Sequence, residues 1–463
     1  MIARHPALAT ALVFLTVLTN AAAVCAQPSS EQLSGTLVSR QPLDELSAKI
    51  IGREVELMQM TSRFRLNNPR ETKAHKWAIA TLSTATYSVV TAGNIVTFTN
   101  GFRFHTHPQD LRAGTAQSGP FLIFLGELIF LSRSLTGATV DIVHAVRVRD
   151  RGFDRRTFER RALQLHSQVQ ELLAQREELS ASGGAEAQQE QRVLRDVAYE
   201  ADREFVTNYV RATELKSFRF WDNAFATSTA GTGAFAGALP TYLGGVFKRP
   251  RYTGPGGIGF IVSGSLFASD VLAAKLISWR AGAESRQRLQ GQLGLASAKP
   301  GDLHSDLKQL SAVASADSAP SSSVRRLRSY GLLAQSLDDH TRLDLREHQR
   351  ERRNWIHDQL WNMIEGGANL AAGAELVNAG FRYHPGPNPL KQFFGARHFL
   401  TRFAWAAVTF TPSAAGGIVD APGEALVKGW VDRRDCRRDL CPEIVLNKRL
   451  SRLDEAAKLA ETH

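Results

Sequence analysis

The chain has 463 residues, of which 43% are hydrophobic, so it is long enough for two to four domains with a sizeable core. Its formal net charge is +11, which suits an anionic lipid surface or an acidic partner, although a solvated Arg-rich surface would give the same value. The charge is the only feature that favours nucleic-acid binding, and the export signal at the N-terminus argues against it.

The chain begins with the pattern of a secretory signal. Arg4 precedes an apolar stretch over 7–24, and small residues mark a cleavage site after residue 26. Cys25 suggests a lipoprotein, but Val24 is bulkier than the usual residue before a lipidated Cys. We therefore expect ordinary cleavage and export to a bacterial cell envelope; an uncleaved anchor is the alternative.

A motif of Trp, Phe and Asp occurs three times. In each copy a Phe follows the Trp at nearly the same interval, beside a basic residue in a Gly/Pro-marked turn, and an Asp follows on a second small-residue segment. The three sets are Trp77, Phe102 and Asp141; Trp221, Phe247 and Asp270; and Trp355, Phe381 and Asp420. The interval from Phe to Asp is identical in copies one and three and shorter in copy two. This repetition predicts one helical hairpin used three times and stacked on its copies.

The predicted fold is all-α, with three pseudo-repeated hairpins rich in small residues, joined by polar, amphipathic, coiled-coil-like helices. In chain order we expect a signal peptide (1–26), a disordered start and amphipathic helix (27–75), hairpin one (76–152), a helical linker pair (153–217), hairpin two (218–282), a broken helical linker (283–352), hairpin three (353–432), and a Cys-containing turn with a C-terminal helix (433–463).

The hairpin arms are long enough to cross a membrane, but their charges conflict with the signal. Residues 77–102 are uncharged and would extend ~37 Å as a helix. A cleaved signal would place the hairpin tips in the cytoplasm, where basic residues gather. The tip at 102–115 has two basic residues, whereas the flank at 146–161 has seven. The third hairpin's first arm contains three acidic residues and would not insert alone: Asp358, Glu365 and Glu375. We therefore expect hairpins that dip into or lie beneath a membrane, or a periplasmic helical core.

One short motif suggests zinc. His105-Thr106-His107-Pro108 resembles the His-x-His-Pro motif of the JAMM metalloprotease family, and the resemblance implies zinc ligation by His105 and His107. That family also needs a downstream Ser and Asp, whose places hold Thr115 and Ser118 here. The third hairpin has a single His, His384, at the equivalent turn, which favours a structural turn over a metal site.

Asp141, Asp270 and Asp420 each lie in an apolar segment, where an ionisable residue is costly and often functional. Three carboxylates at a pseudo-threefold axis would bind a cation or relay protons. The plainer alternative is that each caps a helix or pairs with an Arg. The candidate partners are Arg147, Arg280 and Arg433.

The repeated Trp residues suit either a membrane interface or a soluble core. After signal cleavage two cysteines remain, Cys436 and Cys441. In an exported chain they suit one disulfide closing a small loop, with two unrelated thiols as the alternative. Two cysteines alone do not make a zinc site.

These features favour a non-enzymatic structural or interaction protein of the envelope, associated with a membrane and needing no cofactor. Expected partners are anionic lipid and, through the helical linkers, other envelope proteins; self-association is possible. The sequence has no Walker loop, no Gly-x-Ser-x-Gly elbow and no His-Glu-x-x-His. One alternative is a transporter or channel component that uses the three Asp residues. A second is a zinc-dependent hydrolase that uses His105 and His107.

Overall fold

The structure is a computed structural model that describes most of the chain. The described ranges are 30–67, 73–110, 113–181, 184–247, 249–297, 301–316, 321–383 and 389–461. Within them the chain forms α-helices, short 3-10 helices and one π-helix, and no strand. The fold is therefore all-α, as the sequence predicts. The expected signal peptide, 1–26, lies outside the described residues.

The helices vary widely in length. They are α2 (Ser30–Asn67), α3 (Lys73–Arg103), η1 (Pro108–Asp110), α4 (Ala113–Asp150), α5 (Arg155–Ser180), α6 (Ala185–Gly231), the π-helix η2 (Thr232–Ala238), α7 (Leu239–Val246), η3 (Pro250–Tyr252), α8 (Thr253–Gln292), α9 (Leu303–Ala316), α10 (Ser321–Phe381), α11 (Pro389–Arg437) and α12 (Pro442–Glu461).

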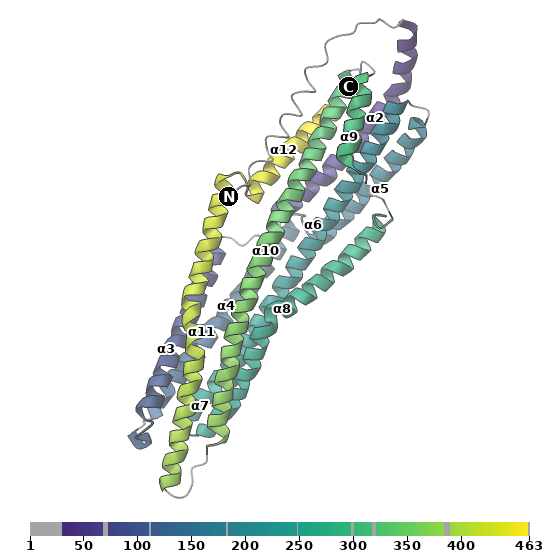
Figure 1. Cartoon of the computed structure of the whole chain (residues 1–463). Helices are drawn as coiled ribbons and strands as arrows, with labels where there is room; N and C mark the ends of the chain where they lie inside the picture. Colours follow the sequence, from purple (N-terminus) through teal and green to yellow (C-terminus); the bar gives the residue numbers. More distant parts are fainter. Residues whose placement is uncertain are drawn as a thin grey trace.

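The molecule is long and narrow, and its helices form two halves along the long axis (Figure 1). We call one the polar half: it contains α2, α5, α9, α12 and the adjoining parts of α6, α8 and α10. Its core is made of buried aliphatic and aromatic side chains, including Phe64 stacked on Phe158 with ring centroids 3.9 Å apart. The other half is the helix ring, which contains the three predicted hairpins.

Six arms close the helix ring in chain order. Each arm packs on the next: α3 on α4, α4 on the α6–η2–α7 arm, that arm on α8, α8 on α10, and α10 on α11. α11 then packs along α3, which closes the ring. We call the end that adjoins the polar half the junction end. The other is the tip end, where the chain turns after Arg103, Val246 and Phe381.

The first two hairpins are closed by the same contact between small residues. Thr97 donates a hydrogen bond to the Gly93 carbonyl, and Thr241 donates one to the Gly237 carbonyl. A Cβ on Gly119 would overlap the Thr97 hydroxyl, and one on Gly256 would overlap the Thr241 hydroxyl. Small residues let helix backbones approach this closely. The interval from Thr97 to Thr241 equals that from Trp77 to Trp221, so the packing follows the repeat in the sequence.

Three expected boundaries differ from the structure. α6 and α10 run without a break from the polar half into the helix ring (Figure 1), so the linker–hairpin boundaries expected after 217 and 352 fall inside continuous helices. Neither boundary contains Pro or Gly, so nothing in the backbone stops the helix there. α2 already begins at Ser30, within the start expected to be disordered. Leu33 and Leu37 are four residues apart in this Ser/Gln-rich segment, a spacing that is compatible with a helix.

Candidate functional site: the helix ring and its buried carboxylates

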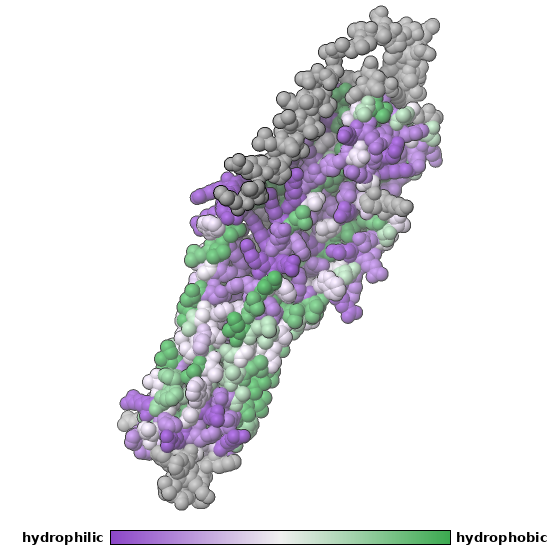
Figure 2. Space-filling model, viewed as in Figure 1, coloured by the Kyte–Doolittle hydropathy of each residue, from purple (hydrophilic) through white to green (hydrophobic). Residues whose placement is uncertain are grey.

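The helix ring exposes most of the large hydrophobic side chains at the described surface. Only Leu179, Val324 and Leu345 among the described exposed ones lie outside it, and the rest fall within 77–146, 220–279 and 356–430. Figure 2 shows them as a pale and green band between the hydrophilic polar half and a hydrophilic patch at the tip end. Soluble monomers rarely expose such a large apolar surface. Exposed apolar surfaces of this kind are typical of sites that contact lipid or protein.

Two helical stretches of the ring are long and apolar enough to cross a membrane. Their most apolar segments lie within Gln117–Ser180, of which α4 belongs to the ring and α5 to the polar half, and within Pro250–Gln292. Only 28% and 39% of these segments are buried. A core helix of a soluble protein would be mostly buried. Many of their apolar residues, such as Leu125 and Val262, are therefore exposed, whereas others, such as Phe130, are buried in the ring.

Exposed aromatic residues lie at both ends of the band, and others, including Phe235 and Trp405, lie between the ends. Exposed rings at the junction end are Trp77, Phe220, Trp221, Trp279 and Trp430, and those at the tip end are Phe102, Phe247, Tyr252 and Phe381. Trp355 is half-buried, and its Nε1 has no hydrogen-bond partner among the described residues. The stretch from each repeated Trp to its Phe covers ~37 Å of helix. Aromatic side chains with this separation match the two interfaces of a bilayer.

Buried carboxylates lie inside the ring on three different arms. Glu127 on α4, Asp270 on α8 and Glu365 on α10 are each at most 7% exposed. The Tyr87 hydroxyl donates to Glu365 Oε2 at 2.7 Å, and Asn362 Nδ2 donates to Asp270 Oδ1 at 2.6 Å. Buried charges need such partners because desolvation is costly.

Glu127 and Glu365 are close enough to interact electrostatically, and Arg133 supplies a positive charge near Glu365. The Glu127 carboxylate lies against Gly233 in η2, where a Cβ would come within 2.7 Å of Glu127 Oε2. Glycine at this position therefore makes room for the carboxylate. A π-helix is rare and often occurs at a functional site.

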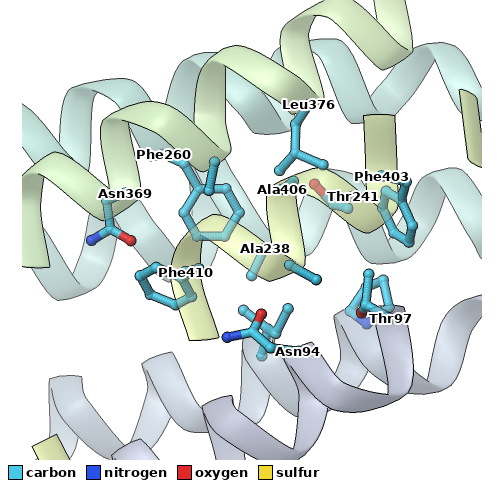
Figure 3. A pocket seen from close by; sticks show the side chains of 14 residues that line it. Asn94, Thr97, Ala238, Thr241, Phe260, Asn369, Leu376, Phe403, Ala406 and Phe410 are labelled. Atoms are coloured by element: carbon cyan, nitrogen blue, oxygen red, sulfur yellow. The ribbon is translucent and has the colours of Figure 1, made fainter. Parts of the chain in front are cut away.

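The centre of the ring contains a small cavity of about 30 Å³. All six arms line it, and Figure 3 shows Asn94, Thr97, Thr241 and Asn369 there among phenylalanine rings. Asn94 Nδ2 and Asn369 Oδ1 have no hydrogen-bond partner among the described residues. The cavity is large enough for a water, and two unsatisfied amide atoms favour one there. A cavity of this size does not form an open channel through the ring.

The three repeated Asp residues have separate partners. Asp141 Oδ2 accepts from Asn223 at 2.9 Å, Asp270 accepts from Asn362, and Asp420 Oδ1 lies 3.5 Å from His357 Nε2. The expected Arg partners are replaced by amides and a histidine. Within the described ranges no group of three His, Cys, Asp or Glu side chains has metal-binding geometry, so the three Asp carboxylates do not form one cation site.

The packing also shows that Asp270 and Asp141 are not at equivalent positions along the second arms of their hairpins. The equivalent contacts of Gly119 and Gly256 fix which positions correspond in the second arms of hairpins one and two. Counted from these two glycines, Ser278 corresponds to Asp141, and Asp270 corresponds to Arg133. The short Phe-to-Asp spacing of copy two reflects this difference in depth.

The histidines of the zinc-like motif are bonded within the protein. Arg397 Nε donates to His105 Nε2 at 2.9 Å, and the Thr401 hydroxyl lies 2.8 Å from His105 Nδ1. His107 Nδ1 lies 2.9 Å from the Thr106 hydroxyl. His105 thus ties the first turn to α11. The equivalent His384 of hairpin three lies outside the described residues.

Cys436 and Cys441 are free thiols in the structure, so of the two alternatives that the sequence left open the disulfide is not formed there. Cys436 is exposed and Cys441 is buried. A hydrogen bond with Cys441, followed by desolvation, raises the pKa of Cys436 to about 11. The neutral thiol is therefore the stable form of Cys436 near neutral pH.

The polar half contains a buried charge network that the sequence patterns did not reveal. Arg449 is fully buried and donates to Glu204 Oε1 at 2.6 Å and to Ser336 Oγ at 2.8 Å. Arg176 is also fully buried and pairs with Glu190 at 2.6 Å. One sequence pattern could have indicated the buried arginine: in α12, Arg449 lies between Leu446 and Leu453 on the apolar face.

At the edge of this network, Asp344 joins α10 to α2 and α6. Burial opposes ionisation of Asp344, but the hydrogen bond and charge of His340 and the charges of Arg65 and Arg211 lower its pKa to about 2. Arg65 Nη1 lies 2.7 Å from Asp344 Oδ1. These contacts fix the helices of the polar half relative to one another.

Comparison with known proteins gives no relative from which a function could be transferred. No protein-family model, curated protein or solved structure matches this chain. The function must therefore be inferred from its own geometry.

Proposed function

We propose that the protein is an exported, membrane-embedded component of a bacterial envelope with a non-enzymatic structural or interaction role. The helix ring lies in the bilayer, and the polar half projects from it to contact other proteins. The observation that carries this proposal is the apolar band, which is confined to the ring and has aromatic residues at both ends. In water that surface would be costly, whereas in lipid it needs no further partner.

The acidic third arm is compatible with this placement because its charges have partners within the ring. Glu365 accepts from Tyr87, and Glu375 pairs with Arg402 at 3.0 Å. His357 lies beside Asp358 near the junction end. α10 would not insert alone, but the closed ring compensates the charges that oppose its insertion.

We infer that the polar half lies on the periplasmic side, because α2 follows the export signal expected from the sequence and lies in that half. The basic residues around 146–161 then face the outer leaflet rather than the cytoplasm, against the usual distribution. We infer that they contact anionic head groups there, with closure of the ring offsetting the unfavourable topology.

Extraction of isolated membranes tests the proposal. An embedded ring remains in the pellet after treatment with alkaline carbonate or high salt, whereas a peripheral protein is released. Truncation to the ring is unsuitable because α6, α8 and α10 run through both halves, so the full chain is used. Release of the full-length protein by carbonate would contradict the proposal.

The buried carboxylates favour a second candidate function, movement of protons or cations through the ring. Glu127 and Glu365 lie inside an apolar ring, where ionisable groups are often functional, and Glu127 lies beside a π-helix. Flux into liposomes containing the purified protein tests this. The substitutions Glu127→Gln and Glu365→Gln should abolish any flux, whereas Asp141→Asn should leave it unchanged because Asp141 bonds Asn223 nearer the junction end. Absence of flux in the unsubstituted protein rules this function out.

A further inference from the structure

A pocket of about 510 Å³ opens where the helix ring meets the polar half. α6 contributes residues 213, 216, 217 and 220, and α8 contributes 281, 284, 285 and 288. Each set has the spacing of one helical face, so the pocket is the space between two facing helix surfaces. Arg155, the first residue of α5, completes the lining. The volume lies within the range of ligand-binding clefts.

The pocket carries net positive charge. Its basic residues are Arg155, Lys216 and Arg288, and its one acidic residue is Glu284. Glu284 pairs with Arg280 at 3.1 Å, and Arg288 pairs with Glu159 at 2.7 Å.

The two remaining cations have no acidic partner among the described residues. Arg155 donates to the Thr213 hydroxyl at 3.0 Å and stacks over the Tyr209 ring. Both contacts are with neutral groups, and they fix the guanidinium in place. Lys216 has no ion-pair partner within the described ranges. Hydroxyls of Ser217 and Ser285 also line the pocket. Cationic side chains with neighbouring hydroxyls have the chemistry that binds a phosphate group.

The apolar band begins at one end of the pocket. Phe220 lines the pocket and is exposed, and the next residue, Trp221, is exposed as well. On α8, Trp279 lies two residues before the lining residue Ala281, and Leu276 extends the exposed apolar surface toward the tip end. A ligand whose phosphate is held in the pocket would thus place its tail along the band. A free phosphate would make no use of these side chains.

We propose that this pocket binds the head-group phosphate of an anionic glycerophospholipid, whose acyl chains lie along α6 and α8. The proposal rests on the membrane placement of the helix ring and names one specific lipid contact within it. Arg155 and Lys216 hold the phosphate, and Ser217 and Ser285 hydrogen-bond to it. Phe220, Trp221 and Trp279 cover the glycerol and the upper acyl chain.

Native mass spectrometry of the detergent-purified full-length protein tests the site. The protein is titrated with phosphatidylglycerol, phosphatidylcholine and inorganic phosphate, and the apparent Kd of each is compared between variants. The test variant is Arg155→Gln with Lys216→Gln. The matched control is Arg352→Gln with Arg353→Gln, which removes two exposed cations from α10 at the same end of the ring. Lys216→Gln alone serves as a second test, because Lys216 is exposed and its loss leaves the fold intact.

The unsubstituted protein should bind phosphatidylglycerol more tightly than phosphatidylcholine. The double test variant should weaken phosphatidylglycerol binding about thirty-fold, since each of the two basic residues contributes a factor of about five. Lys216→Gln should weaken it several-fold, and the control should be unchanged. Equal loss in test and control variants would show nonspecific charge attraction and overturn the site. Inorganic phosphate that displaces phosphatidylglycerol at equal concentration would overturn the lipid assignment.

Failure of the site and failure of the membrane proposal give different results. Carbonate-resistant protein without a phosphatidylglycerol preference contradicts only the site. Carbonate-released protein contradicts the embedded ring, and the lipid site falls with it.

Discussion

A charge placed in the middle of the apolar band distinguishes lipid from water around the helix ring. Val262 on α8 is 45% exposed and lies between Tyr252 at the tip end and Trp279 at the junction end, ~15 and ~25 Å away along the helix. In a bilayer, Val262→Arg replaces a slightly favourable residue with one that costs about 3 kcal/mol near the helix centre. On a solvated surface the same substitution changes stability by about 0.5 kcal/mol or less.

Val324→Arg is the matched control, because Val324 is 59% exposed on the polar half. Both variants are reconstituted in phospholipid vesicles and unfolded with urea, and the transition is followed by tryptophan fluorescence. We expect Val262→Arg to lose about 3 kcal/mol and Val324→Arg to remain within about 0.5 kcal/mol of the unsubstituted protein. Equal, small effects at both positions would refute lipid contact at Val262.

Three further predictions concern the polar half and the C-terminal end of α11. Arg449→Leu removes the guanidinium that pairs with buried Glu204 and should cost about 3–5 kcal/mol; adding Glu204→Leu should recover most of this in denaturant titrations, and no recovery would contradict the pairing. Burial, followed by the charge of Asp202, raises the pKa of Glu54 well above its usual value, and neither carboxylate oxygen has a hydrogen-bond partner in the described structure. The folded state therefore favours protonated Glu54, so stability falls as pH rises above the unfolded pKa of about 4.3. Glu54→Gln should raise the Tm at pH 7 more than at pH 4, and equal shifts would count against this origin. Iodoacetamide should alkylate exposed Cys436 roughly a hundred-fold more slowly at pH 8 than an unperturbed thiol; a normal rate, or protection that only a reductant relieves, would contradict the free-thiol pair.

The turns of the three hairpins could be predicted from the sequence because the residues that form a turn are neighbours in the chain. Phe102, Phe247 and Phe381 all lie within one residue of the end of a first-arm helix. Glycine, proline and the break in apolar spacing mark such positions directly. All-α content followed from the same spacing, since each arm has the periodicity and length of a helix.

The sequence did not predict that α6 and α10 run on as single helices, nor where along its arm Asp270 lies. A polar linker and an apolar arm have different compositions, yet α6 and α10 cross that change as single helices because composition does not stop a helix when no proline or glycine intervenes. The register of Asp270 depends on which glycines of two arms meet, and that contact is set by packing. Spacing from Phe247 alone therefore grouped Asp270 with Asp141.

The buried pairs required long-range information. Arg449 and Glu204 lie 245 residues apart in sequence, and neither has a local signal that identifies the other. An Arg on the apolar face of an amphipathic helix indicates a buried partner, but the partner's identity follows only from the arrangement of α12 beside α10 and α6. The same holds for Tyr87 and Glu365 inside the ring.

Labelling of single cysteines from the periplasmic side tests the embedded ring most directly. In a chain with Cys436 and Cys441 replaced by Ser, a new cysteine is placed at exposed Ser167 on α5 or at exposed Gln109 at the tip end. The account predicts that an impermeant maleimide labels position 167 in intact spheroplasts and labels position 109 only after the membrane is permeabilised. Labelling of both positions in intact spheroplasts would show that the ring does not cross the membrane, and labelling of position 109 alone would contradict export of the polar half.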